Sequence, residues 1–170
     1  MIILVIGAPG TGKTTICQDL SRRYGAPHFE MSWMPEFLRR NGTAISYEED
    51  ERTAVQALVG VAKVYSDAGH RAVFVSDFRN EVLPLAFASL DAYPYQVVRL
   101  YSSAEAILEQ RVMAPARSSG YRDVEAAQAA NREIMAMDFG GSLDIDVARY
   151  EIEDVLAMIR SQILAPNGAI

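Results

Sequence analysis

Short runs of consecutive apolar residues recur along this chain and alternate with longer stretches whose apolar residues stand three or four positions apart. Continuous runs are typical of strands that are buried on both faces of a parallel sheet, whereas the wider spacing predicts amphipathic helices. The runs predict strands at residues 2–6, 28–31, 72–76, 95–101 and 142–147. Because these segments alternate with helical ones, we predict a three-layer α/β fold with a five-stranded parallel sheet flanked by helices.

The predicted helices carry start signals at several of their ends. Ser46 and Ser102 each stand three residues before a glutamate, as in a capping box, and Asp123 is a suitable N-cap residue. The segment at 113–122, MAPARSSGYR, has the proline, serine and glycine content of a loop, and we expect it to be a short mobile lid. The helices are predicted at residues 14–24, 35–40, 46–69, 84–90, 102–112, 123–137 and 151–164.

The size and composition of the chain fit one globular domain, which we expect to span residues 1–170. The 170 residues are 50% hydrophobic and 22% charged, which is enough apolar material for one core. The single cysteine, Cys17, cannot form an internal disulfide. It lies beside the apolar face of a predicted helix, so we expect its thiol to be buried.

The charge and hydropathy patterns exclude several classes of function. A formal net charge of −6 is not the basic footprint of a protein that binds duplex nucleic acid. No run approaches the roughly 18 apolar residues that a membrane-spanning helix needs. The first apolar run also lacks the basic residues that precede it in a signal peptide. We therefore expect a cytoplasmic protein without a membrane or a duplex nucleic acid as its partner.

The clearest motif lies between the first predicted strand and the first predicted helix. The segment from Gly7 to Thr14, GAPGTGKT, fits G-x-x-x-x-G-K-[ST] at every defined position and in the context that phosphate binding requires. Glycines allow successive backbone N–H groups to face one anion, and the helix N-terminus adds partial positive charge. The motif predicts that Lys13 reaches the β- and γ-phosphates of a nucleotide and that the Thr14 hydroxyl binds Mg²⁺.

The segment GAPGTGKTT resembles the Walker A loop of P-loop NTPases, and it is most similar to that of their small-kinase branch. This branch includes adenylate-kinase-like nucleotide kinases, shikimate and gluconate kinases, and polynucleotide kinases. The resemblance covers residues 1–164 and implies that the cofactors are ATP and Mg²⁺. The residues implied to bind ATP are Gly7, Ala8, Pro9, Gly10, Thr11, Gly12, Lys13, Thr14 and Thr15.

An acidic residue directly follows the third predicted strand, in the segment VFVSDFRNE. Ligands of open α/β sheets bind at the carboxyl ends of strands, so Asp77 is a candidate to hold Mg²⁺ or to accept the proton of an attacking hydroxyl. The segment resembles the S-D-x-R or S-D-x-N stretch of phosphomevalonate-kinase-like, deoxynucleotide-kinase-like and polynucleotide-kinase-like proteins. In the first two groups the arginine helps to hold a phosphorylated acceptor, which implies that role for Arg79.

The residues after the second predicted strand are candidates for binding the phosphoryl acceptor. Glu30 and Ser32 are polar groups there, Trp33 can line a pocket, and Arg39 can contact an anion. Many kinases of the branch carry an acid at this place, but the segment has no Asp-x-Asp. Asp77 is therefore the first candidate for the general base, and Glu30 is the second.

Arginines cluster around the predicted lid, although the chain as a whole is acidic. Arg117 and Arg122 lie within it, and Arg111 and Arg132 flank it. Guanidinium groups stabilise the negative charge of a phosphoryl group during transfer, and closure of a lid excludes water. The resembling kinases stack an arginine just before the lid on the adenine and use lid arginines on the phosphates. The first role is therefore implied for Arg111, and the second for Arg117 and Arg122.

Together these features predict a P-loop kinase that moves the γ-phosphoryl of ATP to a small acceptor, namely a nucleotide, a nucleoside or a phosphorylated metabolite. Asp146 lies in the last predicted strand, where such kinases contact the adenine mainly through backbone groups, so the choice between ATP and GTP stays open. The alternatives are a polynucleotide 5′-kinase and a nucleotide-binding switch without a small acceptor. We expect a monomer or a homodimer.

Overall fold

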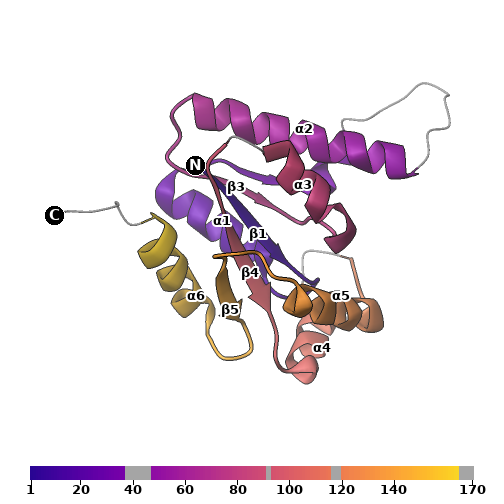
Figure 1. The fold of residues 1–170 in the computed structure, drawn as a ribbon. Coiled ribbons are helices and arrows are strands. Elements are labelled where there is room, and N and C mark those ends of the chain that lie inside the picture. The colour runs from indigo at the N-terminus through magenta and orange to yellow at the C-terminus, as the bar shows by residue number, and fades with distance from the viewer. Residues whose placement is uncertain (37–46, 91–92, 116–119, 165–170) are drawn as a thin grey trace. The chain divides into compact units, whose positions relative to one another are not determined.

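The computed structural model contains, in the residues it describes, a five-stranded parallel sheet flanked by six α-helices (Figure 1). The described residues are 1–36, 47–90, 93–115 and 120–164. The strands follow the order β2-β3-β1-β4-β5, so the first strand in sequence is the central strand of the sheet. This architecture confirms the α/β fold class that was predicted from the alternation of apolar runs and helical segments.

The strands lie where the apolar runs placed them, within one or two residues at each end. Every residue of the first and third strands is buried, as expected for strands covered on both faces. The second and fifth strands are shorter than predicted, with three and four residues. The strands are β1 (Ile2–Gly7), β2 (His28–Glu30), β3 (Val73–Ser76), β4 (Tyr95–Tyr101) and β5 (Leu143–Asp146).

The helices also begin and end close to the predicted boundaries. Gly25 and Gly69, just beyond the first two helices, have φ angles of 62° and 89°, the left-handed conformation that commonly ends a helix. No helix in the described part of the chain is both long and apolar enough to cross a membrane. The helices are α1 (Lys13–Tyr24), α2 (Tyr47–Asp67), α3 (Leu83–Leu90), α4 (Glu105–Met113), α5 (Val124–Ala136) and α6 (Ile152–Ile159).

The start of α4 differs from the start that the sequence predicted. The prediction of a capping box formed by Ser102 and Glu105 is wrong, because Ala104 is the N-cap residue and makes no side-chain cap bond. The backbone N–H and C=O of Ser102 instead pair with the side-chain amide of Asn131 on α5, at 2.9 and 2.8 Å. The serine therefore ties α5 to the end of β4 through its backbone rather than beginning α4.

Helices α5 and α6 both begin with an acidic side chain that can accept hydrogen bonds from the free backbone N–H groups of the first turn. The predicted cap of α5 is confirmed, since the Asp123 carboxylate accepts a hydrogen bond of 3.0 Å from Ala126 N. Helix α6 begins with a reciprocal capping box of Glu151 and Asp154, which the sequence analysis missed. Its last predicted residues form a π-helical turn, Arg160–Leu164.

Short helical segments follow β2 and β3. Met31–Glu36 is a 3₁₀ helix, whereas the sequence predicted a strand to residue 31 and an α-helix at 35–40. Most of that predicted helix, and the predicted cap Ser46, lie outside the described residues. A second 3₁₀ helix, Asn80–Val82, leads directly into α3.

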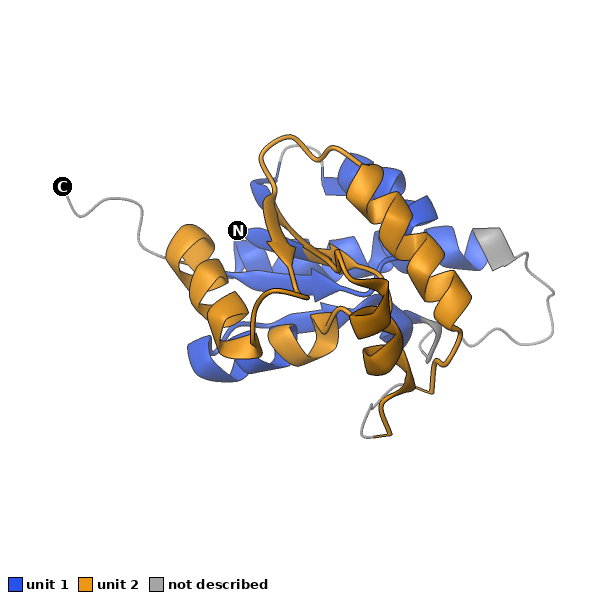
Figure 2. Cartoon of the chain, turned by 90° about the horizontal axis from the view of Figure 1, so that it is seen from below, with its two compact units in different colours: residues 1–4, 17–96 blue, residues 5–16, 97–170 orange. Residues whose placement is uncertain are grey.

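The chain divides into two compact units, which are coloured separately in Figure 2. Unit 1 comprises residues 1–4 and 17–96, and unit 2 comprises residues 5–16 and 97–170. The residues predicted to bind the acceptor belong to unit 1, and the phosphate loop and the predicted lid belong to unit 2.

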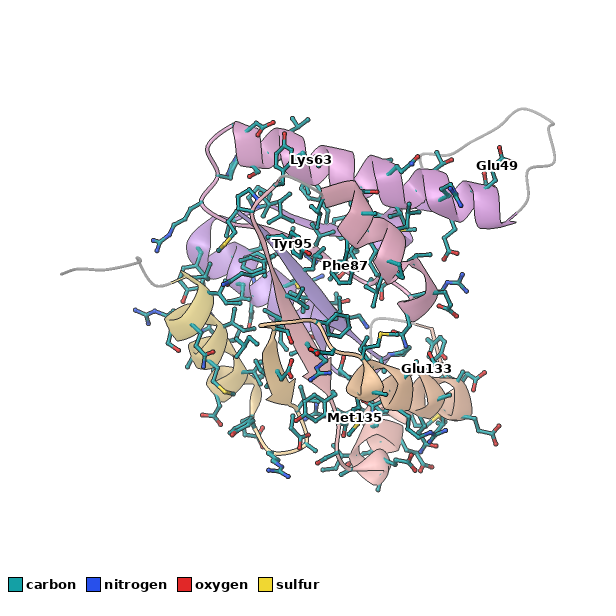
Figure 3. All side chains as sticks on the ribbon, in the orientation of Figure 1. Glu49, Lys63, Phe87, Tyr95, Glu133 and Met135 are labelled. Atoms are coloured by element: carbon teal, nitrogen blue, oxygen red, sulfur yellow. The ribbon has the colours of Figure 1, made fainter. Side chains whose placement is uncertain are left out.

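In unit 1, α2 packs on β3 and on α3. Leu58 of α2, Phe74 of β3 and Leu83 of α3 are completely or almost completely buried. Phe87 on α3 stacks on Tyr95 at the start of β4, with 5.9 Å between the ring centroids (Figure 3). In unit 2, α4 packs on α5. These contacts fix the loops that carry the candidate site residues.

Candidate active site

The phosphate loop connects β1 to α1 through residues 8–12, as its motif predicted. Gly7, Gly10 and Gly12 have φ angles of 153°, 93° and 88°, which residues with a Cβ rarely adopt. The Thr11 hydroxyl donates a hydrogen bond of 2.8 Å to Ala8 O and closes the turn from inside. The loop therefore has the backbone conformation that allows several N–H groups to face one anion.

Two of the glycines are also required by close approach. A Cβ at Gly7 would lie 2.3 Å from the backbone oxygen of Leu100 on β4, and one at Gly10 would lie 2.9 Å from Val112 Cγ2 on α4. Any larger residue would push the loop off the strand and the helix that support it. Gly7, a defined position of the motif, and Gly10, an undefined one, thus fix the position of the loop as well as its shape.

Lys13 is the buried cation of this loop. Its residue is 7% exposed, and its Nζ donates hydrogen bonds to Gly7 O at 2.8 Å and to Ala8 O at 3.2 Å. The ammonium group is therefore held across the mouth of the loop that a phosphate would enter. Thr14, the next residue, is partly exposed at the first turn of α1, where a hydroxyl can reach a metal ion.

Asp77 follows β3 directly and has a backbone conformation that is unusual for its type. Its φ angle is 69°, and among the described residues other than glycine it is the one with a positive φ. Aspartate tolerates this left-handed conformation better than most residues, yet such positions are uncommon and are often found at functional sites. The turn directs the chain away from the sheet immediately after Ser76, so the carboxylate stands at the end of β3.

Arg79, two residues later, is held by an ion pair within unit 1. Its Nε and Nη2 atoms donate to Oε1 and Oε2 of Glu51 on α2, at 2.6 and 2.5 Å. This two-pronged geometry uses both oxygens of the carboxylate and fixes the plane of the guanidinium group. No local pattern in the sequence predicts this pair, because the two residues are 28 positions apart.

A buried polar cluster joins β2 to β3. His28 Nε2 lies 3.0 Å from Ser76 Oγ and 3.5 Å from Glu30 Oε1. The side chains of His28 and Glu30 are only 4% and 8% exposed. Burial lowers the pKa of His28 to about 4, so the ring is neutral at physiological pH.

The sequence contained a signal for this cluster that was missed. His28 and Glu30 are two residues apart on a strand and therefore point to the same face of the sheet. The parallel register then places Glu30 opposite Ser76. Of the other residues predicted to bind the phosphoryl acceptor, Ser32 and Trp33 are exposed in the 3₁₀ helix after β2.

Trp33 contributes an aromatic surface beside the polar cluster. Its ring meets the His28 ring edge-on, with centroids 5.5 Å apart, and the residue is 40% exposed. Carboxylate, imidazole, hydroxyl and indole groups thus come together in unit 1. Arg39, the remaining predicted acceptor residue, lies outside the described residues.

Asp146, predicted to lie near the adenine, organises the turn after β5. Its Oδ1 accepts hydrogen bonds from Ser103 N at 3.0 Å and from Ala148 N at 3.1 Å, and its Oδ2 pairs with Arg149 Nε at 2.9 Å. Burial alone would raise the pKa of Asp146, but these hydrogen bonds and the arginine together hold it below its ordinary value. The carboxylate therefore shapes the backbone after β5.

The predicted lid arginines have different surroundings. Arg111 is partly buried, and its Nη2 donates to Val147 O at 2.9 Å, which joins α4 to the turn after β5. Arg122 is exposed, and its Nη1 donates to Tyr121 O at 2.8 Å. Arg132 pairs with Glu105 at 2.6 Å in an exposed ion pair. Arg117 lies outside the described residues.

The residues present fit a nucleotide and a hard divalent cation. The left-handed glycines and Lys13 form a cradle for phosphate, as described above. Within the described ranges, no group of three or more His, Cys, Asp or Glu residues could hold a metal by itself. Mg²⁺ does not need such a group, because it keeps several waters and binds through substrate phosphates and one or two oxygen ligands. The candidate oxygen ligands are Thr14 and Asp77.

Comparison with known proteins agrees with this geometry. The profile of the AAA domain family matches residues 6–129, which include the phosphate loop, both candidate carboxylates and the predicted lid. A protein of Sulfurisphaera tokodaii named "Putative adenylate kinase" is 25% identical over 175 residues, covering 95% of this chain and 81% of the relative.

Solved structures of two other proteins share the fold. The tunicamycin resistance protein of Deinococcus radiodurans has a TM-score of 0.69 at 19% identity and covers 95% of this chain and 94% of its own. A gluconokinase of Sinorhizobium meliloti has a TM-score of 0.61 at 18% identity and covers 92% and 87%. Fold and phosphate loop together confirm the predicted class, a small P-loop kinase. The chain belongs to the AAA domain family.

Proposed function

We propose that this protein transfers the γ-phosphoryl group of ATP to a small-molecule acceptor. The observation that carries the proposal is the phosphate loop, whose buried Lys13 Nζ lies across the carbonyls of Gly7 and Ala8. A phosphate that enters the loop replaces those two carbonyl oxygens as the hydrogen-bond acceptor of the Lys13 ammonium group. Mg²⁺, when bound, neutralises charge on the β- and γ-phosphates. We propose the cytoplasm, where ATP is available, as its location.

Unit 2 contains the other residues that we propose to contact the nucleotide. We propose that the backbone N–H groups of residues 10–15 surround the phosphates and that Thr14 Oγ holds the metal. The turn shaped by Asp146 is proposed to contact the base through its backbone. Arg111 borders this turn, and Arg122 supplies charge to the transferred group when the lid closes.

On the acceptor side, we propose that Asp77 orients the attacking group and accepts its proton. Its position at the carboxyl end of a parallel strand and its left-handed φ of 69° support this role. Glu30 is the second candidate for the base, because its carboxylate belongs to the buried cluster on β2. Ser32 and Trp33 are proposed to contact the acceptor, and Asp77 also remains a candidate metal ligand.

The acceptors expected from the sequence were nucleotides, nucleosides and phosphorylated metabolites, handled by a monomer or a homodimer. A polynucleotide 5′-kinase is the alternative within the same class, and salt-sensitive retention on single-stranded oligonucleotide would favour it. A nucleotide-binding switch would bind ATP tightly but phosphorylate no small molecule. We favour the small acceptor, because the buried polar cluster of unit 1 has the chemistry of a small-molecule site.

The proposal is tested by a transfer assay that follows the acceptor by mass spectrometry. The protein is incubated with Mg-ATP and a pooled panel of nucleosides, nucleotides, sugars and their phosphates. We expect one acceptor to gain a phosphoryl group with the wild type and none with Lys13→Ala. Lys63→Ala is the matched control, because Lys63 is the only other lysine of the chain. It lies on α2, with its Nζ over the ring of Tyr93. Transfer that survives Lys13→Ala would contradict the proposal.

Asp77→Asn tests the base with little disturbance of the backbone. Asparagine also tolerates the left-handed conformation, so the substitution removes charge without adding strain. We expect kcat to fall by about 10²- to 10⁴-fold, the usual contribution of a general base, with the KM for ATP changed little. Glu81→Gln, at an exposed position of the following 3₁₀ helix, is the control. If kcat is unchanged in Asp77→Asn, Asp77 is not the general base, and Glu30 becomes the first candidate for it.

A further inference from the structure

A charged residue continues the buried apolar stripe of α2. Ala54, Val55 and Leu58 on this helix are completely or almost completely buried. Glu51 stands three, four and seven positions before them, so it belongs to the same face of the helix. The helix packs on β3, and the side chain of Glu51 is only 13% exposed. A carboxylate at such a position needs a partner that offsets its loss of water.

The partner is Arg79, in the loop that follows β3 within the same unit. Its Nε and Nη2 atoms donate to the two carboxylate oxygens of Glu51. The arginine side chain is 48% exposed, so the pair adds little stability, but the use of both oxygens fixes the plane of the guanidinium group. The main effect of the pair is therefore to tie the beginning of α2 to the loop after β3.

That loop carries Asp77 in a conformation that needs support from its surroundings. The φ angle of 69° costs free energy in a residue with a Cβ, and such a conformation persists where the flanking structure fixes it. On one side of Asp77 lies Ser76, the completely buried last residue of β3. On the other side, Phe78 and Asn80 are 4% and 8% exposed. Arg79, between these two buried residues, attaches the loop to α2.

From this arrangement we infer that Glu51 and Arg79 are positioning residues, which hold Asp77 in its left-handed turn so that its carboxylate meets the attacking group. The inference rests on the proposed role of Asp77 and extends it to an ion pair that acts through the backbone of the loop. Loss of either partner breaks the same pair, so both losses have the same effect. An arginine that bound a phosphorylated acceptor would behave differently, because Glu51 would then compete with the acceptor for it.

The turnover of single and double variants tests this inference. We expect Glu51→Gln and Arg79→Gln each to lower kcat by about 10- to 100-fold with the KM for ATP changed little, since a misplacement of about 1 Å can cost about 100-fold in rate. The double variant Glu51→Gln/Arg79→Gln should lose no more than either single variant. Neither substitution should lower kcat further in the Asp77→Asn background, because the pair acts through that carboxylate.

Two control variants separate positioning from a general loss of stability. Arg52→Gln removes an exposed arginine next to Glu51, and Val59→Ala truncates a buried side chain of the same helix. Both should keep the kcat of the wild type, although Val59→Ala should unfold at a lower urea concentration. The inference is overturned if Arg79→Gln raises the KM of the acceptor at unchanged kcat while Glu51→Gln lowers that KM. Additive losses of kcat in the double variant would also overturn it.

A measurement by NMR tests the inference without any acceptor. A residue with a left-handed φ holds its amide proton close to its own α proton, so the NOE between these two protons is strong. We expect this NOE at Asp77 in the wild type and in Arg52→Gln, and we expect it to lose most of its intensity in Glu51→Gln and Arg79→Gln. Unchanged intensity in the last two variants would overturn the inference. Failure of the proposed function would appear separately, as phosphoryl transfer that does not depend on Lys13.

Discussion

His28 is a residue whose charge state is changed strongly by folding. In the unfolded chain its pKa is near 6.5, and in the folded protein burial lowers it to about 4. Between these two values the unfolded state binds more protons than the folded state, so stability falls as the pH decreases. The neutral ring forms a hydrogen bond of 3.0 Å between Nε2 and Ser76 Oγ, and Glu30 Oε1 lies 3.5 Å from the same nitrogen.

We predict that His28 makes folding sensitive to mild acid. The wild type should lose up to about 3 kcal/mol of unfolding free energy as the pH falls from 6.5 to 4, because 2.5 pKa units correspond to that energy. His28→Gln should remove this part of the pH dependence, as measured by urea denaturation at several pH values. His70→Gln is the control, since His70 is exposed. Equal slopes in the wild type and His28→Gln would contradict the prediction.

At the scale of elements, α5 is anchored to the end of β4 by polar groups rather than by apolar packing alone. Asn131 is 1% exposed and pairs with both backbone groups of Ser102. At the C-terminal end of the helix, Arg99 Nη1 donates to Met137 O at 2.6 Å, and its Nε donates to Asp144 Oδ1 at 2.9 Å. The helix that follows the predicted lid is thereby fixed within unit 2.

We predict that Asn131→Leu destabilises the protein by about 1–3 kcal/mol. Leucine cannot satisfy the N–H and C=O of Ser102, and buried backbone groups without partners carry a cost of this size. The neighbouring Arg132→Ala should cost less than about 1 kcal/mol, because its ion pair with Glu105 is exposed. Chemical denaturation of the three proteins measures both effects. An Asn131→Leu variant as stable as Arg132→Ala would show that the Ser102 bonds contribute little.

The sequence predicted most elements of this fold because local signals and tertiary structure agree there. The buried strand and the phosphate loop are both encoded within residues 2–14, where composition and glycine positions leave little freedom. The Ser102 cap failed because a tertiary partner, Asn131, competed for the same backbone groups. The Glu51–Arg79 pair was missed for the same reason, since residues far apart in sequence carry no local signal of their contact.

At the scale of the whole molecule, nucleotide binding and folding are linked. A ligand that binds only the folded protein raises its unfolding free energy by about 2.7 kcal/mol at one hundred times the dissociation constant. We predict this stabilisation for a non-hydrolysable ATP analogue with Mg²⁺, and its loss in Lys13→Ala, by thermal unfolding with and without ligand. Lys63→Ala should respond as the wild type does. Equal stabilisation of all three proteins would place the nucleotide away from the phosphate loop.

The single cysteine gives this molecule a practical property. Cys17 is completely buried in α1, and it is the only thiol of the chain. Thiol reagents act on accessible thiolates, so the native protein should be inert toward maleimide dyes without any cysteine having to be removed. A cysteine introduced at an exposed position of each unit, such as Gln56 and Gln110, would then take up a donor and an acceptor fluorophore. The buried thiol thus makes the protein ready for single-molecule observation of its catalytic cycle.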